Sequence, residues 1–180
     1  DIFLTKIKPN GETIWSKRIG SYLNGVQRGI YNENGEGITV DSLGNIYVIG
    51  RFHYNTFIDN QIFYAAGTND IIFLKFNTHG DLQWAKQLGA SYNGWGKGIA
   101  VDYEGNILLT GDFVGTISID SHSVTSKPGH WSSFVAKFDS IGNVKWIHKA
   151  IPDIGHNYVS NIVVDYQGNC YVTGDFGGGI

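Results

Sequence analysis

Methionine is absent from this 180-residue chain, and cysteine occurs only once. The chain begins at Asp1 and shows no signal peptide, so we expect either a processed mature form or a piece of a longer protein. Cys170 stands where the sequence predicts a buried strand, and a lone cysteine in that setting behaves as a small hydrophobic residue. The sequence therefore assigns Cys170 to packing rather than to catalysis or redox chemistry.

Clusters of like charge are also missing. The chain has 13 basic and 16 acidic residues, a net charge of −3, and its Lys and Arg residues are scattered singly. This pattern argues against nucleic-acid binding and against a polybasic membrane contact. No apolar run approaches the roughly 20 residues of a membrane span, so we expect no transmembrane segment.

The short motifs of catalysis and cofactor binding are absent as well. The six His residues show no pairing at metal-ligand spacing. No phosphate-binding loop, dinucleotide fingerprint or nucleophile elbow occurs. We therefore expect no metal, no cofactor and no catalytic residue.

Glycine, by contrast, is abundant, with 25 residues, and it punctuates a phrase that occurs three times. The phrase reads GIAVDYEGNILLTGDF at Gly98–Phe113, with near-copies at Gly37–Phe52 and Asn161–Phe176. Each copy predicts two strands joined by a turn in which an Asp side chain accepts hydrogen bonds from backbone amides and a Gly is left-handed. We expect positive φ at the three glycines of this turn, which are Gly44, Gly105 and Gly168.

A second repeated phrase fills the gaps between copies of the first. It begins near Asp1, Asp70 and Ser132, and it again predicts a strand, a Gly turn and a strand. Together the two phrases make a four-stranded unit with a period near 60 residues, which indicates an all-β fold, a β-propeller built of four-stranded antiparallel blades. We expect about three blades' worth of chain in one propeller unit: an outer half-blade at 1–20, blades at 21–90 and 91–150, and an inner half-blade at 151–180.

The two phrases resemble the bacterial β-propeller repeat family known as SBBP. The stretches Gly98–Gly111 and Asp70–Trp84 carry the resemblance almost throughout, and it extends over essentially the whole chain. The chain departs from the pattern at Asn161, Ser132 and Arg51. The resemblance implies an exported protein, located outside the cell or on its surface, and it is specific for the repeat and not for an activity.

Several residues recur in phase and are expected to serve the architecture. Trp15, Trp84 and Trp146 are predicted to occupy equivalent core or inter-blade places, and Lys6, Lys75 and Lys137 recur with them. The turn aspartates Asp41, Asp102 and Asp165 could be calcium ligands, but a tight turn uses its carboxylate locally, which favours a structural role.

The connections between the predicted strands lie at two opposite ends of the predicted unit. Short Gly turns share one end, and the longer connections 22–36, 91–97 and 151–160, together with 52–69 and 114–131, share the other. Because rigid scaffolds carry function on variable loops, the candidate surface lies at that second end. Its candidate ligand-binding residues are Trp95, Tyr92, Asn93, Tyr22, Arg28, Tyr158 and Asn157, accompanied by Asn24, Tyr31 and His156.

Trp95 is the most informative of these residues. It stands between Gly94 and Gly96, with little local structure to pack on, so we expect it to be markedly more exposed than the repeated tryptophans. An exposed Trp can stack on a sugar ring or anchor a peptide; the alternative is that it folds back over the inner strands and closes the channel mouth.

Function is predicted only in outline. The leading hypothesis is a non-enzymatic binding or adhesion module of a surface protein, with a protein or carbohydrate ligand. The alternatives are a polysaccharide lyase or glycosidase, for which Arg51, Asp112, Asp175 and His156 are weak candidates, and a purely structural spacer. Since three wedge-shaped blades do not close a ring, we expect further blades from a longer chain, or two copies that pair into six. We favour the longer chain.

Overall fold

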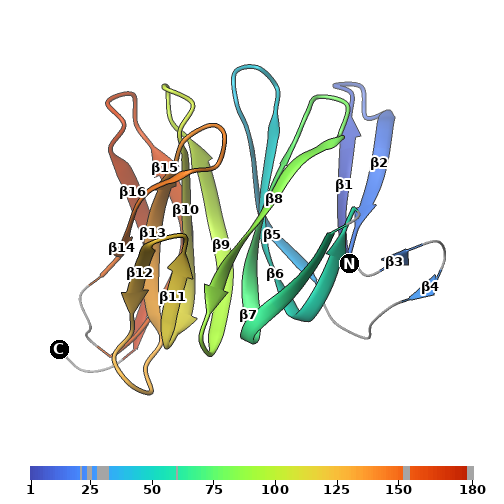
Figure 1. Ribbon diagram of the computed structural model, residues 1–180. Coiled ribbons are helices and arrows are strands. Elements are labelled where there is room, and N and C mark those ends of the chain that lie inside the picture. Colours follow the sequence, from blue (N-terminus) through green and yellow to red (C-terminus); the bar gives the residue numbers. More distant parts are fainter. Residues whose placement is uncertain (21, 24–25, 28–32, 60, 152–154, 178–180) are drawn as a thin grey trace.

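The computed structural model describes residues 1–20, 22–23, 26–27, 33–59, 61–151 and 155–177. Strands joined by tight turns make up this described part of the chain, and no helix occurs in it. The predicted all-β fold is confirmed. Figure 1 shows hairpins standing side by side, with those of early sequence at one side and those of late sequence at the other. No segment of the described chain forms a helix long and apolar enough to cross a bilayer.

Two four-stranded antiparallel units form the centre of the fold. The first unit is β5 (Asn34–Val40), β6 (Ile46–Ile58), β7 (Gln61–Phe76) and β8 (Leu82–Ala90), paired in chain order. The second unit is β9 (Asn93–Val101), β10 (Ile107–Val114), β13 (Ser132–Phe138) and β14 (Val144–Lys149). The hairpin of β11 (Thr116–Ile119) and β12 (His122–Thr125) branches from the second unit and pairs with β8.

A two-stranded hairpin flanks each end of this pair of units. The N-terminal hairpin is β1 (Ile2–Ile7) with β2 (Thr13–Ile19), and the C-terminal hairpin is β15 (His156–Val164) with β16 (Cys170–Gly177). The short strands β3 (Tyr22–Leu23) and β4 (Val26–Gln27) pair between β2 and β5. The described strands therefore follow the predicted repeat of turn-linked pairs, while the predicted division into four segments stays a prediction.

Three apolar layers hold these hairpins and units together in sequence. The first layer joins the N-terminal hairpin, through Ile2 and Leu4, to the first unit. The second joins the first unit to the second and includes Phe73 and Phe138, whose ring centroids lie 5.3 Å apart. The third joins the second unit to Ile162 in the C-terminal hairpin. The central strands β6, β10 and β13 are covered on both faces, which is why they contain runs of apolar residues rather than an alternating pattern.

Among the described residues, one turn geometry occurs six times. In each turn the amide of the fourth residue donates to the carbonyl of the first, and the first amide donates to the fifth carbonyl; the turns span Lys8–Glu12, Asp41–Asn45, Asn77–Asp81, Asp102–Asn106, Asp139–Asn143 and Asp165–Asn169. The fourth residue is always Gly, with φ between 76° and 87°. The predicted positive φ at Gly44, Gly105 and Gly168 is therefore confirmed.

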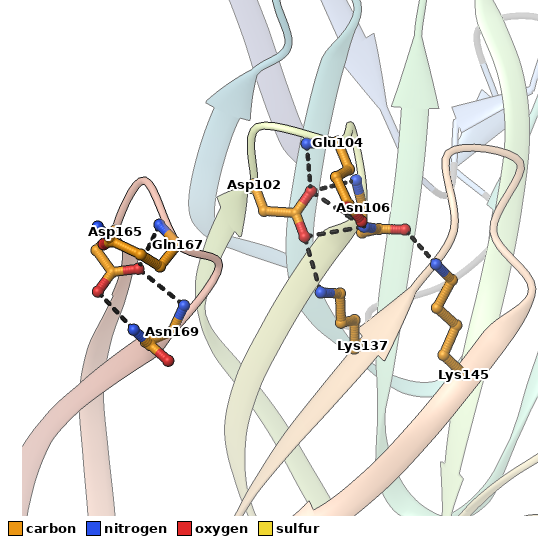
Figure 2. A network of polar contacts seen from close by, with 8 residues as sticks. All are labelled: Asp102, Glu104, Asn106, Lys137, Lys145, Asp165, Gln167 and Asn169. Atoms are coloured by element: carbon orange, nitrogen blue, oxygen red, sulfur yellow. Dashed lines mark hydrogen bonds and ion pairs between the residues drawn. The ribbon is translucent and has the colours of Figure 1, made fainter.

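The turn carboxylates accept hydrogen bonds from amides of their own turns, and Asp102 also pairs with Lys137. Asp102 Oδ1 accepts from the amides of Glu104 (3.0 Å) and Asn106 (2.8 Å), and its Oδ2 lies 2.8 Å from Lys137 Nζ. Figure 2 shows this network beside the equivalent turn at Asp165. Burial alone would raise the pKa of Asp102, but the Lys137 and Asn106 hydrogen bonds outweigh it and hold that pKa below its ordinary value. These contacts support the structural role of the aspartates over the calcium alternative.

The repeated tryptophans occupy equivalent places, as predicted. Trp15 stands opposite Lys6 in the register, Trp84 opposite Lys75, and Trp146 opposite Lys137, each beside the same irregularity in pairing. Two of the lysines also reach into the following unit, because Lys6 Nζ donates to Thr78 O (3.1 Å) and Lys75 Nζ donates to Ser140 O (2.8 Å). Trp and Lys therefore tie one repeat to the next.

Much of three of the five predicted longer connections proved to be strand rather than loop. Most of the predicted loop 91–97 lies in β9, the predicted loop 52–69 is the far end of the β6–β7 hairpin, and the second half of 151–160 lies in β15. The glycines that suggested a loop are required by close packing, since a Cβ on Gly96 would lie 2.5 Å from Ile49 Cγ1. The extra residue Lys97 is absorbed as a β-bulge between Gly96 and Gly98.

Candidate functional site

Trp95 lies near the start of β9, whose other end leads into the Gly turn at Asp102–Asn106, and it stands across from Asp112 in β10. Its side chain is half-buried, as are those of Trp15, Trp84 and Trp146. The prediction that Trp95 would be markedly more exposed is therefore wrong. The physical reason is that Trp95 contacts Trp131 and Arg51, which come from two other segments of the chain and which its own glycine neighbours did not reveal.

The main partner of Trp95 is Trp131, which directly precedes β13. Their ring centroids lie 4.4 Å apart. Trp131 in turn lies 6.0 Å from Tyr158 in β15, and the ring of Tyr158 is nearly parallel to that of His156 at 6.4 Å. His156 stacks on His130 at 5.0 Å. These five rings form a continuous row, named here the aromatic row, that crosses from the second unit to the C-terminal hairpin.

Two cations flank the Trp95 end of the aromatic row. The guanidinium of Arg51 lies 4.8 Å from the centroid of the Trp95 ring, and Lys97 Nζ lies 5.4 Å from it. Both distances fall within the range of a cation–π attraction. Arg51 Nε also lies 3.7 Å from a Glu36 carboxylate oxygen, so part of its charge is already balanced. Lys97 occupies the β-bulge of β9, which directs this extra residue toward the same ring.

Backbone hydrogen bonds fix Trp131 in the row. Its amide donates to His156 Nδ1 at 3.1 Å, and its carbonyl accepts from the amide of Asn157 at 3.1 Å. The side chain of Asn157 is completely buried. The predicted role of Asn157 as a ligand contact does not fit this burial, and its visible role is to position Trp131.

A hollow of about 630 Å³ adjoins Trp131. Its lining includes Tyr92, Asn93 and Trp131, together with Thr125 at the end of β12 and Pro128. Tyr92 is 62% exposed, so its ring is free to contact a ligand. Asn93 Oδ1 accepts a hydrogen bond from Asn69 Nδ2 at 2.8 Å, which leaves the amide group of Asn93 as a further donor.

Asp112 lies beneath this surface rather than on it. It is 1% exposed, and its Oδ1 accepts from Ser133 Oγ (3.0 Å) and from the amide of Val159 (2.8 Å). Burial raises the pKa of Asp112 to about 6, although these two hydrogen bonds and the charge of Lys97 oppose the shift. Because both bonds link β10 to neighbouring strands, Asp112 joins the second unit to the C-terminal hairpin. Asp175, the other weak catalytic candidate, is exposed on β16.

Comparison with known proteins identifies the repeat. The family profile described as SBBP, β-propeller repeat, matches residues 14–51 and 83–112. Over these two segments the chain is similar to that repeat. The matched segments contain Trp15, Trp84 and the turn glycines Gly44 and Gly105, which are the residues that link and shape the repeats in the structure.

Two further proteins are similar to this chain. An uncharacterised WD repeat-containing protein of Acanthamoeba polyphaga mimivirus is 23% identical over 200 residues, a match that covers 98% of this chain. The chain spans only 14% of the length of that relative. A solved structure of a protein of unknown function from Bacteroides caccae has 11% identity and a TM-score of 0.28, covering 91% of this chain and 75% of that one.

The candidate residues are thus brought together only in part. Trp95, Tyr158 and His156 belong to the aromatic row, and Tyr92 and Asn93 line the adjoining hollow. Tyr22 lies in β3, on the far side of the first unit, and the predicted residues Arg28, Asn24 and Tyr31 lie outside the described residues.

Sequence reasoning missed Trp131 and His130. Trp131 stands out of phase with the repeated tryptophans, as Trp95 does, and the same criterion would have found it. Within the described ranges, no three His, Cys, Asp or Glu side chains gather as a metal site would require.

Proposed function

We propose that these SBBP repeats form a β-propeller arc that binds a ligand through the aromatic row. In this proposal the two four-stranded units are blades, and the flanking hairpins are the outer and inner halves of further blades. The support is the order of packing, because each strand pair contacts the next through an apolar layer and none is bypassed. Propeller blades are built and packed in this way.

The pair of half-exposed tryptophans, Trp95 and Trp131, carries the binding proposal. Large aromatic rings that are held rigid and remain partly exposed are efficient contact surfaces, because they contribute area with little loss of side-chain entropy. The backbone bonds to Trp131 and the cations beside Trp95 hold the two rings in place before a ligand arrives. Such preorganisation lowers the entropic cost of binding.

We infer a carbohydrate ligand, since a sugar ring presents C–H groups to an aromatic face and hydroxyl groups at its edge. The aromatic row supplies the faces, and Asn93, His130 and Tyr92 supply nearby hydrogen-bonding groups. Arg51 and Lys97 favour a sugar that carries a carboxylate or sulfate over a neutral one. The Asp112 carboxylate already accepts hydrogen bonds from Ser133 and Val159, which favours a binding role for the site over that of a lyase or glycosidase. Export to the cell surface remains part of the proposal and follows from the family resemblance alone.

A glycan array that includes uronic and sulfated saccharides tests this function. We expect the intact chain to bind a subset of acidic saccharides, and Trp131→Ala to weaken that binding about tenfold or more. Tyr103→Ala is the matched control, because Tyr103 is 80% exposed in a Gly turn at the opposite end. Equal loss in both variants, or binding confined to peptides in a parallel peptide array, would overturn the carbohydrate proposal.

A further inference from the structure

The hollow of about 630 Å³ is built from segments in the middle of the chain. All of its lining lies within residues 91–131, which the structure describes throughout. Backbone hydrogen bonds fix its walls, because the Ser91 amide donates to Thr116 O at 2.8 Å and the Ser126 amide donates to Gly115 O at 2.8 Å. The hollow is therefore formed before any ligand arrives, as binding sites for small groups usually are.

Two serine hydroxyls in the lining are set to donate hydrogen bonds. Ser91 Oγ accepts from the amide of Thr116 at 2.8 Å. Ser126 Oγ accepts from the amide of Gly115 at 2.9 Å. Each hydroxyl oxygen already accepts from the backbone, which leaves its own hydrogen to be donated. Both side chains can therefore offer a hydrogen to an acceptor placed in the hollow.

A chain of hydrogen bonds orients the amide group of Asn93 in the same sense. Asn93 Oδ1 accepts from Asn69 Nδ2 at 2.8 Å, and Asn69 Oδ1 lies 3.2 Å from His53 Nδ1. Because an amide oxygen only accepts, His53 donates to Asn69, which in turn donates to Asn93. Hydrogen bonds that run in one direction polarise one another. The amide nitrogen of Asn93, at the end of this chain, is the third donor of the lining.

The rest of the lining is uncharged and largely apolar. Within the described residues, no Asp, Glu, Lys or Arg side chain lines the hollow. Val114, Pro128 and Trp131 supply much of its apolar surface. An anion in the hollow would lose hydration without meeting an opposite charge there, which is costly. The walls fit a neutral group that combines a hydrogen-bond acceptor with a small apolar part.

We propose that the hollow binds the acetamido group of an N-acetylated amino sugar. The carbonyl oxygen of this group accepts from the lining donors, of which Asn93 is the polarised one, and its methyl group packs on Trp131 and Pro128. Its N–H is left for the Tyr92 hydroxyl, which accepts as well as donates. A sugar hydroxyl in the same place would supply a weaker acceptor and no methyl group.

The acidic part of the same saccharide then lies at the other end of the tryptophan pair. Trp131 lines the hollow and lies 4.4 Å from Trp95, whose ring is flanked by Arg51 and Lys97. Cations and neutral donors are thus placed on either side of two neighbouring rings. This inference rests on the proposed function, and it narrows the ligand to an acidic saccharide that contains a 2-acetamido sugar.

Saccharides that differ in one substituent test the inference on the unmodified chain. An oligosaccharide of uronic acid and a 2-acetamido sugar is compared by calorimetric titration with the same oligosaccharide carrying a hydroxyl group in place of the acetamido group. Both have the same charge, so Arg51 and Lys97 affect them equally. We expect the acetamido form to bind about tenfold more tightly. An N-sulfated form is the third ligand, and we expect it to bind more weakly than the acetamido form.

Asn93→Asp tests the donor, because it keeps the shape of the side chain and replaces the NH₂ group by an oxygen. We expect the preference for the acetamido form over the hydroxyl form to disappear in this variant. Ser123→Asp is the matched control, since it adds the same charge at an exposed position of β12 outside the lining and should keep the preference.

Three results would overturn this inference while acidic saccharides still bind. They are equal affinity of the unmodified chain for the acetamido and hydroxyl forms, tightest binding of the N-sulfated form, and an undiminished acetamido preference in Asn93→Asp. If none of the acidic saccharides bound at all, the proposed function would fail together with the inference.

Discussion

Trp84 of the first unit lies against Gly142 in a turn of the second, so closely that a Cβ on Gly142 would come within 3.2 Å of Trp84 Cζ2. In the same way, a Cβ on Gly80 would lie 3.0 Å from Trp15 Cζ2. The repeated Trp and the repeated Gly are therefore two halves of one contact between successive repeats. This contact explains why both residues occur in phase.

Substitution of Gly142 by Ala should expose that contact. Any L-residue at φ 87° costs about 1–2 kcal/mol, and in Gly142→Ala the new methyl group also collides with Trp84 and Lys86. Gly168→Ala is the control, since its φ is 84° but nothing lies within 4 Å of the new Cβ. We expect chemical denaturation to show that Gly142→Ala loses about 1–3 kcal/mol more than the control. Equal losses would mean that the contact between repeats contributes no specificity at this turn.

The Asp102 turn should be the most sensitive of the aspartate turns. Asp102→Ala removes the acceptor of the Glu104 and Asn106 amides and the partner of Lys137. Because Asp102 is buried, water cannot fully replace these bonds, and we expect a loss of about 2–4 kcal/mol in unfolding free energy. Asp165→Ala, in an exposed turn with the same bonds, should lose less. A larger loss in Asp165→Ala than in Asp102→Ala would contradict this ranking.

Asp112 should make stability fall as the pH rises from about 4 to 6. Its pKa is raised from 3.8 to about 6 in the folded chain, so in this window the folded state binds more protons than the unfolded state. Its contribution is therefore fully present at lower pH and declines by up to about 3 kcal/mol by pH 7. The turn aspartates have lowered pKa values, and their contributions are lost only as the pH falls below about 4.

Asp112→Asn isolates this effect. The amide oxygen of Asn can accept the same bonds from Ser133 and Val159 without a charge. Unfolding midpoints should match those of the unmodified chain below about pH 4 and exceed them by a growing margin from there to pH 7. If the two curves ran parallel across this range, the titration would have to be assigned to another group.

The repeat and its turns could be predicted from the sequence because they depend on local rules. Gly105 and its counterparts have the predicted positive φ, since a five-residue turn with Asp at its start fixes its own geometry. Trp84 was placed correctly because its spacing from Gly80 recurs in each copy. Both inferences needed only residues close together in the chain.

The candidate site depended on contacts between distant segments, and there the sequence was a weaker guide. Gly94 and Gly96 suggested a loop around Trp95, but they are packing glycines in a strand that approaches Ala90 and Ile49 closely. The partner of Trp95, Trp131, follows 36 residues later and belongs to another connection. Asn157 was predicted to face a ligand, and its burial arises from the approach of β15 to the segment before β13.

The indole N–H signals in a two-dimensional NMR spectrum of the ¹⁵N-labelled chain test ligand binding by the aromatic row most directly. The chain has five tryptophans, and therefore five such signals. During titration with an acidic saccharide selected on the array, we predict that the signals of Trp95 and Trp131 shift together with one dissociation constant, while those of Trp15, Trp84 and Trp146 stay in place. Unchanged Trp95 and Trp131 signals at saturating ligand would contradict the account.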